Sequence, residues 1–522
     1  MPSLNWLGKD KVITYHQHVP FHFLDKKFSV GNSDNKIIHG DNLIALKSLL
    51  PRYENKIKCI YIDPPYNTGN ENWIYNDNVS DSRLQKWLGQ VVGKEGEDLT
   101  RHDKWLCMMY PRLRLLQKLL ANDGAIFISI DDTELFNLKF VCDEIFGVNN
   151  FISNISNVNK PSGRTFSKFV ATAHEYILIY AKNIDSLTWK GFKPEEKVTK
   201  RFNKIDKDGR KYRETDLRKT GDFDLREDRP NLFYYFYYNE MTGDFFPDTE
   251  DKVLLGYIQI KPIRADGMES VWRWSIDLAR QNLSAIFPKY LPTRKVWSVM
   301  QKDYLDDKEF VKPTSSWTFK DVNSERGTET FINLGFDKKD FPKPKPVGTV
   351  ERILQLATEK NSIVLDSFAG SGTTAHAVIN LNKQDGGNRK FILIELNDYA
   401  ENITAERVKR VGGEFTFYEI GEKLFDEDGF LNESVPLEKI FDYIYFSETG
   451  KNYVPSEEKN LLGLDNDTAY YFFENLSWTA LAQIKTRAEN YVIYAESCNL
   501  SDNELMKYRI TFKQIPFDVR KY

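Results

Sequence analysis

The stretch IVLDSFAGSGTT, residues 363–374, joins a short apolar strand, a glycine turn and the start of a helix. Glycine suits positions 370 and 372 because the backbone there must turn tightly and come close to a ligand. The N–H groups at the start of the following helix then point toward that ligand. This order is typical of a nucleoside site in a parallel α/β sheet, although such glycines also occur where only packing requires them.

Two carboxylates narrow the choice of ligand at this turn. Glu395 ends the next apolar strand, about 20 residues after the turn, where a carboxylate can accept both ribose hydroxyls. Asp366 precedes the turn in the pattern DxFxGxG, whereas dinucleotide sites follow GxGxxG. A carboxylate is a poor neighbour for pyrophosphate and a good one for an ammonium group. The pattern therefore favours the methionine end of S-adenosylmethionine.

The rhythm of short apolar strands followed by helices appears in two separate segments. Residues 36–130 contain the strand-ending motifs HGD and IDPPY and the strand AIFISI, and residues 346–396 contain IVLDSF and FILIEL. Runs this apolar suit strands that helices cover on both faces. We expect one α/β fold, with a Rossmann-like core built on a mixed, mainly parallel sheet, a large inserted domain and a C-terminal domain.

The length of 522 residues suggests about three domains. Residues 151–345 hold 35 Lys and Arg against 29 Asp and Glu, whereas those from 415 onward hold 11 against 19. The overall charge of −4 thus conceals a basic insert and an acidic tail. The predicted parts are an N-terminal extension (1–34), the two core halves (35–150 and 343–412), the insert (151–342) and the C-terminal domain (413–522).

A second apolar strand, KCIYI (58–62), ends in Asp63-Pro64-Pro65-Tyr66. The amino nitrogen of a nucleobase is a poor nucleophile, but the Asp63 carboxylate and the Pro64 carbonyl could accept hydrogen bonds from both of its hydrogens. Pro65 fixes the turn, and Tyr66 offers a face on which an extruded base can stack. The cluster predicts a clamp for a planar amine, and the alternative is an ordinary proline turn with a capping aspartate.

At these two motifs the sequence resembles the DNA amino-methyltransferases, in which DPPY is the catalytic motif and DSFAGSG the cofactor motif. The catalytic motif comes first and a large insert separates the two, which is the order of the β class. Three segments, DPPYNTGNENWIYNDN (63–78), WLCMMYPRLRLL (105–116) and AIFISIDDTEL (125–135), look more narrowly like the modification subunits of type III restriction–modification systems. The resemblance covers residues 35–412 and is looser in the insert.

This resemblance implies an S-adenosylmethionine-dependent methyltransferase core that modifies N6 of a flipped-out adenine. It implies that the base is held by Asp63, Pro64, Pro65 and Tyr66. The cofactor positions that it implies are Asp41 for the adenine, Glu395 for the ribose, Asp366 for the methionine end, Lys345 and Pro346 facing the methionine moiety, and Phe368, Gly370, Gly372 and Thr373 shaping the pocket.

Other activities remain as alternatives at this stage. Related N4-cytosine enzymes more often carry serine in place of Asp63, so the sequence favours adenine over N4-cytosine. C5-cytosine chemistry needs a nucleophilic thiolate, and none of the four cysteines follows a proline. A catalytically silent DNA-binding assembly subunit is disfavoured by the intact DPPY and glycine turn. A metabolic nucleotide enzyme is disfavoured by the DxFxGxG pattern.

The family also implies double-stranded DNA as substrate, a homodimer, and a restriction subunit with helicase and nuclease functions as partner. Four scattered cysteines predict a reduced, cytoplasmic environment. No apolar run approaches the ~20 residues of a membrane span, so no membrane is expected as a partner. The cluster His16, His18 and His22 has no acidic neighbour at a suitable spacing, and we expect no metal site.

Three further segments allow two interpretations each. The basic run 197–219 could grip DNA phosphates or form a solvated face. The aromatic run 231–240 could stack on bases, but a buried strand is the better explanation. The loop from Asn67 to Thr100, rich in Gly, Asn and charge, is expected to close over the flipped base.

Overall fold

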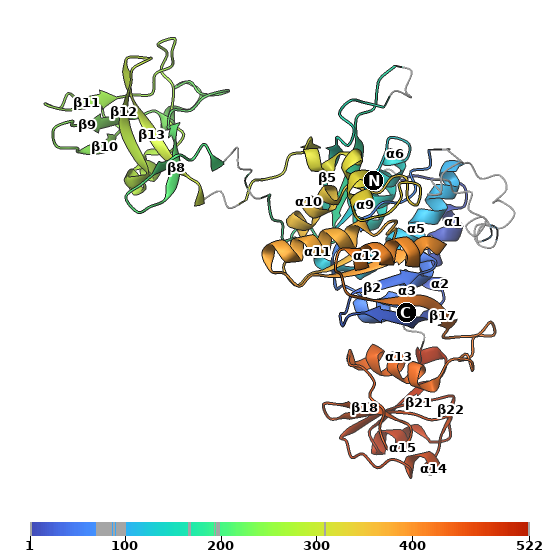
Figure 1. Ribbon diagram of the computed structural model, residues 1–522. Coiled ribbons are helices and arrows are strands. Elements are labelled where there is room, and N and C mark those ends of the chain that lie inside the picture. Colours follow the sequence, from blue (N-terminus) through green and yellow to red (C-terminus); the bar gives the residue numbers. More distant parts are fainter. Residues whose placement is uncertain are drawn as a thin grey trace. The chain divides into compact units, whose positions relative to one another are not determined.

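A ten-stranded mixed sheet is the centre of the larger part of the chain (Figure 1). The computed structural model describes residues 3–68, 86, 89, 101–164, 169–192, 194, 199–306 and 310–519. The chain divides into two units, one formed by Met1–Lys190 with Thr314–Tyr522 and the other by Gly191–Pro313. Most of the loop that the sequence predicts to close over the base lies outside the described residues.

The strand order places the two halves of the core side by side. Across the sheet it is β1 (His22–Val30), β17 (Phe415–Lys423), β2 (Lys36–His39), β16 (Lys390–Glu395), β15 (Ile363–Asp366), β3 (Ile57–Ile62), β4 (Leu120–Ile130), β6 (Glu175–Ala181), β5 (Phe151–Asn157) and β14 (Ser316–Trp317). All neighbours from β17 to β4 pair in parallel, and β1 and β6 run antiparallel to theirs. The expected mixed, mainly parallel sheet is confirmed.

Helices cover both faces of this sheet. On one face Ile60 and Ile62 of β3 pack into a core shared with α3 (Asn42–Tyr53), α5 (Arg101–Leu119) and α6 (Leu135–Phe146). Cys59 and Tyr61 alternate with them and are also fully buried, on the opposite face. There α10 (Val347–Ala357) packs against β3 and against α11 (Thr373–Asp385), which lies on β16. The even burial of β3 explains why its sequence shows no polar alternation.

The separate unit, Gly191–Pro313, is narrower than the insert of 151–342 expected from the sequence. The difference arises because β5 and β6 extend the main sheet beyond β4, and β14 returns to pair with β5. The helix α9 (Ser324–Asn333) also belongs to the larger unit, where Phe331 packs near the chain that follows β16. Composition sets residues 151–342 apart in the sequence, but it does not indicate which strands of that range pair with the main sheet.

The smaller unit contains two antiparallel sheets. One is ordered β12 (Ile286–Leu291), β13 (Val296–Tyr304), β8 (Lys211–Asp216), β7 (Lys204–Ile205), and the other β10 (Phe245–Asp248), β9 (Tyr235–Tyr238), β11 (Ile258–Ile260). The aromatic run forms the central strand β9, and its Tyr234, Phe236 and Tyr237 are at most 1% exposed. The run is therefore a buried strand with its neighbours, as the sequence favoured. A short helix, α8 (Ile276–Gln281), completes this core.

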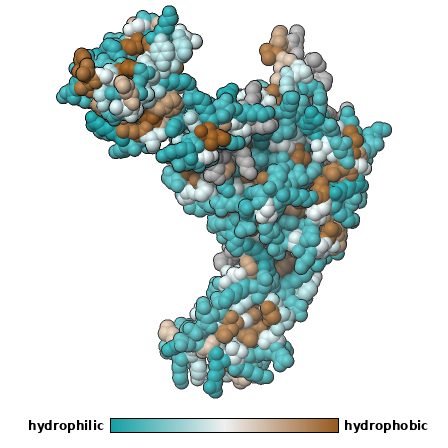
Figure 2. Space-filling view, turned by 60° about the vertical axis from the view of Figure 1, so that its left-hand side comes forward, coloured by the Kyte–Doolittle hydropathy of each residue, from teal (hydrophilic) through white to brown (hydrophobic). Residues whose placement is uncertain are grey.

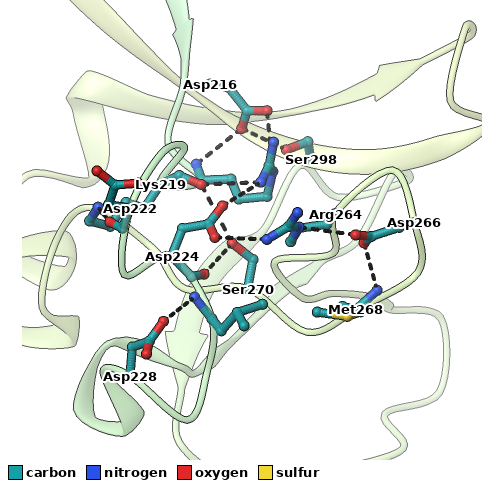
Figure 3. Close-up of polar contacts among 12 residues, drawn as sticks. Asp216, Lys219, Asp222, Asp224, Asp228, Arg264, Asp266, Met268, Ser270 and Ser298 are labelled. Atoms are coloured by element: carbon teal, nitrogen blue, oxygen red, sulfur yellow. Dashed lines mark hydrogen bonds and ion pairs between the residues drawn. The ribbon is translucent and has the colours of Figure 1, made fainter.

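A network of carboxylates and arginines fixes the loops of the smaller unit (Figure 3). Asp224 is buried and accepts from Arg264 at 3.0 Å, and its backbone carbonyl accepts from Ser270 Oγ at 2.7 Å. Asp216 accepts from Ser298 Oγ at 3.1 Å and pairs with Arg218 at 3.9 Å. Much of the positive charge in this unit is thus neutralised internally.

The C-terminal residues contribute first to the core and then to a domain of their own. β17 pairs with β2 and β1 and therefore belongs to the main sheet. Beyond it lie α13 (Leu437–Thr449) and a four-stranded sheet of β18 (Leu461–Asp465), β19 (Thr468–Phe472), β21 (Asn490–Ala495) and β23 (Ile510–Gln514). Arg52 at the end of α3 donates to Asp442 of α13 at 2.5 Å. The remaining short helices are α1 (Lys9–Val12), α2 (Tyr15–His18), α12 (Glu406–Arg410), α14 (Trp478–Leu481) and α15 (Asp502–Lys507).

Hydrophobic side chains appear as small separate patches on the face shown in Figure 2. Scattered exposed apolar residues are normal for a folded chain. Among the described residues, no helix has both the length and the apolar character to cross a membrane. In the same residues no group of three His, Cys, Asp or Glu side chains is placed to hold a metal ion.

Candidate active site

The side chains predicted to carry function gather at one edge of the main sheet. Parallel strands end at the same edge, and Asp63, Asp366 and Glu395 follow or end β3, β15 and β16, which are neighbours. From β3 the chain continues to β4 on one side, and from β15 to β16 on the other. Such a reversal of direction opens the crevice in which α/β sheets bind ligands.

The turn after β3 is held rigidly by its surroundings. Pro64 is buried, and the Pro65 carbonyl accepts a hydrogen bond from Trp105 Nε1 at 2.7 Å. Asn67 is fully buried with a φ of 59°, and its Nδ2 donates to Glu134 Oε1 at 2.5 Å. A buried non-glycine residue in the left-handed region is uncommon and needs such support. The turn therefore presents Asp63 and Tyr66 on a preorganised backbone.

Asp63 and Tyr66 meet the side chain of Lys345. The Lys345 Nζ lies 3.3 Å from Asp63 Oδ1 and donates to Tyr66 Oη at 2.6 Å. It also lies 5.0 Å from the centroid of the Tyr66 ring. The resemblance implies that Lys345 faces the cofactor. In the structure its ammonium reaches the amine clamp, and its backbone carbonyl contacts the glycine turn, accepting from Thr373 Oγ1 at 3.3 Å. Pro346 follows as the N-cap of α10.

Glu175 completes this cluster and was not identified from the sequence. Its Oε2 accepts from Lys345 Nζ at 2.8 Å and from Tyr66 Oη at 3.1 Å, and its Oε1 accepts from Asn157 Nδ2 at 3.2 Å. Glu175 begins the otherwise apolar strand β6. Because β6 is antiparallel to β4, its first residue lies at the edge where the parallel strands end. A carboxylate opening the apolar run EYILIYA was the available signal.

The electrostatics of the clamp follow from burial, from the Lys345 ammonium and from the two carboxylates. Burial raises the pKa of Asp63 to about 6, against the opposing effect of Lys345. Burial by itself would lower the pKa of Lys345, but Asp63 and Glu175 outweigh it and raise that pKa. Burial and the two carboxylates raise the pKa of Tyr66 well above its usual value. Near neutral pH the cluster thus carries two carboxylates, one ammonium and a neutral phenol.

The glycine turn has the conformation that its sequence predicts. Gly370 and Gly372 have φ values of 52° and 81°. A Cβ on Gly372 would lie 3.0 Å from the Thr404 carbonyl oxygen, so both conformation and space require glycine there. Phe368 follows β15 and packs partly buried against the main core. The turn brings the start of α11 to the crevice.

Two carboxylates hold this turn in place by accepting hydrogen bonds from its residues. Asp366 accepts from the Phe368 N–H at 3.0 Å and from Thr374 Oγ1 at 2.5 Å. Glu395 accepts from the Gly370 N–H at 2.7 Å and from the Asn397 N–H at 3.0 Å. Burial raises the pKa of Asp366 to about 7 and that of Glu395 above its usual range, although the hydrogen bonds oppose both shifts.

Asp41 lies at the end of β2 and caps α3. Its Oδ1 accepts from the Leu43 N–H at 2.8 Å and from Arg112 Nη2 at 3.0 Å. The neighbouring Asn42 donates to the Ser367 carbonyl at 2.8 Å. This chain of contacts connects α3 and α5 to the glycine turn, so Asp41 has a structural task at the position where the sequence expected a contact with adenine.

Arg407 of α12 lies fully buried behind the turn and was also not identified from the sequence. Its Nη1 donates to Ser371 Oγ at 2.7 Å and to Thr373 Oγ1 at 2.8 Å. Within the described part of the chain it makes no ion pair with a carboxylate, and burial lowers its pKa to about 9. A positive charge thus stands beside the N-terminus of α11, where the helix dipole has the same sign.

The basic run 197–219 was predicted either to grip phosphates or to form a solvated face. In the structure its described residues include the hairpin β7–β8, and several of its cations pair with carboxylates of the same unit. These pairs are Lys204–Glu214, Arg213–Asp303 and Arg210–Asp306. The unit 191–313 contains 24 Lys and Arg against 22 Asp and Glu. Its net charge is therefore a weak indication of DNA binding.

Known proteins are similar to this chain over the region that contains both motifs. The sequence model of a DNA methylase family matches residues 57–406. The chain is 34% identical over 418 residues to the EcoPI Mod subunit of a type III restriction-modification enzyme from Escherichia phage P1, covering 76% of this chain and 64% of that protein. It is 36% identical over 366 residues to the type II methyltransferase M.KpnI of Klebsiella pneumoniae, covering 70% and 81%. It is 32% identical over 433 residues to the EcoP15I Mod subunit of Escherichia coli, covering 76% and 64%.

The chain thus spans slightly less than two thirds of these two Mod subunits, at 64% of each. Among solved structures, the cytosine-N4-specific PvuII DNA methyltransferase aligns over 80% of this chain and 93% of that chain at 12% identity, with a TM-score of 0.34. A complex of M1.HpyAVI with SAM aligns over 71% and 98% at 16% identity, with a TM-score of 0.30. Scores this low carry no argument about substrate or cofactor.

Proposed function

This chain belongs to the DNA methylase family, and we propose that it transfers a methyl group from S-adenosylmethionine to N6 of an adenine flipped out of double-stranded DNA. The observation that carries the proposal is the pairing of β3 with β15. This pairing sets the Asp63 clamp and the Asp366 turn beside each other at one edge of the sheet, so that an amine and a methyl donor could be held in contact.

The residues around the glycine turn fit a cofactor that has both positively and negatively charged groups. Asp366 and Glu395 are buried carboxylates with raised pKa values, so a nearby cation would favour their ionised forms. The start of α11, backed by Arg407, offers positive charge for a carboxylate. S-adenosylmethionine has an ammonium, a carboxylate and a sulfonium, and it supplies an activated methyl group when bound.

We assign the cofactor positions accordingly. Glu395 would hold the ribose, and Asp366 with the Lys345-Pro346 backbone would face the methionine moiety. Gly370, Gly372 and Thr373 would shape the pocket together with Phe368. Asp41 would lie at the cofactor adenine, with Arg112 holding its carboxylate in place.

The target amine would be held by groups that only accept hydrogen bonds. Asp63 and the Pro64 carbonyl accept from its two hydrogens, and Tyr66 stacks on the base. With S-adenosylmethionine bound, a nitrogen held in this way would be aligned to take the methyl group, the carbon–sulfur electron pair would leave with sulfur, and the positive charge would pass to nitrogen. One N–H proton then moves to the Asp63 carboxylate, and its electron pair stays on nitrogen. Alignment and electrostatics suffice, and no covalent enzyme intermediate is needed.

Adenine is the proposed base because Asp63 occupies the first position of the DPPY motif. N4-cytosine is the alternative, since the same clamp accepts hydrogen bonds from any exocyclic amine. For assembly, the similarity to Mod subunits supports a modification subunit that works with a restriction subunit. The homodimer that the resemblance implies stays a proposal. The similarity to M.KpnI, at 36% identity, supports a second form in which the chain methylates DNA without such a partner.

The proposal is tested by incubating the protein with labelled S-adenosylmethionine and unmethylated genomic DNA. We expect N6-methyladenine in one short sequence context. N4-methylcytosine would overturn the choice of base. Cofactor binding without any transfer, with and without added partner subunits, would instead support the catalytically silent assembly subunit.

A further inference from the structure

Lys345 creates an electrostatic difficulty for the proposed reaction. Its ammonium lies 3.3 Å from Oδ1 of Asp63, and the Asp63 carboxylate has to accept from the target amine. An ammonium that paired fully with Asp63 would compete for this oxygen. It would also repel the positive charge that appears on the nitrogen during transfer. Such a site needs a second anionic group that binds the Lys345 ammonium, so that its charge is balanced without occupying Asp63.

Glu175 has the geometry of that group. Its contact with Lys345 Nζ, at 2.8 Å, is shorter than the 3.3 Å between Lys345 and Asp63. The Glu175 side chain is only 4% exposed, and its other oxygen is held by Asn157 at 3.2 Å. The carboxylate is thus fixed in place at the start of a buried strand, and long-range screening by solvent is weak.

Glu175 also makes the net charge of the cluster negative. With Asp63 and Lys345 alone, the charges of one carboxylate and one ammonium would cancel. Glu175 adds a second negative charge, and Tyr66 stays a neutral phenol because its pKa is raised well above the usual value. The cluster of Asp63, Lys345, Glu175 and Tyr66 then presents one net negative charge to an amine that becomes cationic, which stabilises the transition state.

We propose that Glu175 is a positioning residue for methyl transfer, which holds the Lys345 ammonium so that the Asp63 carboxylate stays available to the target amine. This inference rests on the proposed function. Glu175 acts through Lys345 and Tyr66 and does not itself touch the substrate. Tyr66 is placed by the same contact, since its hydroxyl donates to Glu175 Oε2 at 3.1 Å.

The test compares Glu175→Gln with wild type at saturating cofactor. We expect kcat to fall about 10- to 100-fold, less than the roughly 100- to 1000-fold lost when a group that contacts the transition state is removed, because Glu175 acts through Lys345. Affinity for S-adenosylmethionine should stay within about twofold, because the turn after β15 is untouched. Glu175→Asp should recover part of kcat. The matched control is Tyr176→Phe, the next residue of β6, whose hydroxyl contacts the exposed Asp132 and lies outside the cluster.

A pH profile separates positioning from mere support of the fold. The titratable groups that act on Asp63 are Lys345, Glu175, Tyr66, Tyr61 and Asp366. Removing Glu175 takes away a negative charge and leaves Lys345 to pair with Asp63, so the acid limb of kcat/KM should move to lower pH. A merely structural role predicts lower activity with an unmoved limb, and that result would overturn the proposal.

Two further measurements keep the test decisive. If Glu175→Gln is poorly folded, the double variant Lys345→Met/Glu175→Gln removes the cation that would otherwise pair with Asp63. It should be better folded and more active than Glu175→Gln, whereas additive losses would overturn the proposal. The titration of Asp63, followed by ¹³C NMR with Asp63→Asn to identify its signal, does not depend on activity. If wild type transfers no methyl group, the proposed function fails, and an Asp63 midpoint unmoved by Glu175→Gln would separately refute the role of Glu175.

Discussion

Tyr66 and Lys345 are 279 residues apart in the chain, and the Lys345 ammonium donates a 2.6 Å hydrogen bond to the Tyr66 hydroxyl. The contact joins the segment after β3 to the segment before α10, and thus the amine clamp to the region of the glycine turn. Through Lys345 the two motifs are physically coupled, since its ammonium lies at one and its carbonyl at the other.

Asp63→Asn should lower methyl transfer at least about 100-fold, because the amide replaces one accepting oxygen by a donor. Affinity for S-adenosylmethionine, measured by calorimetry, should change by less than about threefold, since the glycine turn is intact. Asp132→Asn is the control, as this exposed carboxylate follows the neighbouring strand β4 at the same edge of the sheet. Equal losses of transfer and cofactor binding in Asp63→Asn would contradict the division of the site into clamp and turn.

Transfer should be lost in acid as Asp63 takes up a proton. Burial raises the pKa of Asp63 to about 6, so its accepting carboxylate form predominates above pH 6 and disappears as the pH falls through that value. The measurement is kcat at saturating cofactor between pH 5 and pH 8. The pKa of Asp366, about 7, should appear separately as weaker cofactor binding below pH 7. Activity that stays constant down to pH 5 would refute the role of Asp63.

The fold could be predicted from sequence because its signals are local. IVLDSFAGSGTT and KCIYIDPPY each combine a largely buried strand with the residues that end it, and both lie where expected. The resemblance drawn from these motifs is confirmed by the family match over residues 57–406 and by the identities to Mod subunits. A two-glycine turn with positive φ at both glycines is a conformation that few other sequences adopt.

Two parts of the site could not be predicted, because they depend on long-range pairing. Glu175 reaches Lys345 and Tyr66 only because β6 turns back antiparallel to β4. The carboxylate that opens EYILIYA is visible in the sequence, but nothing near it indicates that register. Arg407 lies in AERVKR, where three of its neighbours are also charged, and such a pattern is typical of a solvent-exposed helix. Its burial follows from the packing of α12 behind the glycine turn.

Gly372→Ala should weaken cofactor binding at least about tenfold, whereas Gly386→Ala should not. Both glycines have positive φ, 81° and 66°, at opposite ends of α11, so both variants carry a conformational cost of about 1 kcal/mol in the free energy of unfolding. Only the Cβ at 372 meets the backbone, 3.0 Å from the Thr404 carbonyl, whereas that at 386 has open space. Urea unfolding and calorimetry check the two effects. Equal cofactor affinity in the two variants would show that the turn accommodates a Cβ at position 372 without loss of the binding site.

Arg407→Met should lower the affinity for S-adenosylmethionine about tenfold, in line with the loss of one buried charge at an anion site. Its Nη1 holds both Ser371 and Thr373 at the start of α11, so the variant loses positive charge and two hydrogen bonds at the turn. Affinity for 5′-methylthioadenosine, which lacks the amino-acid group, should change much less. Arg410→Met, on the same helix but exposed and paired with Glu406, is the matched control. An equal loss for both ligands would mean that Arg407 supports the fold of the turn and does not contribute to binding the carboxylate.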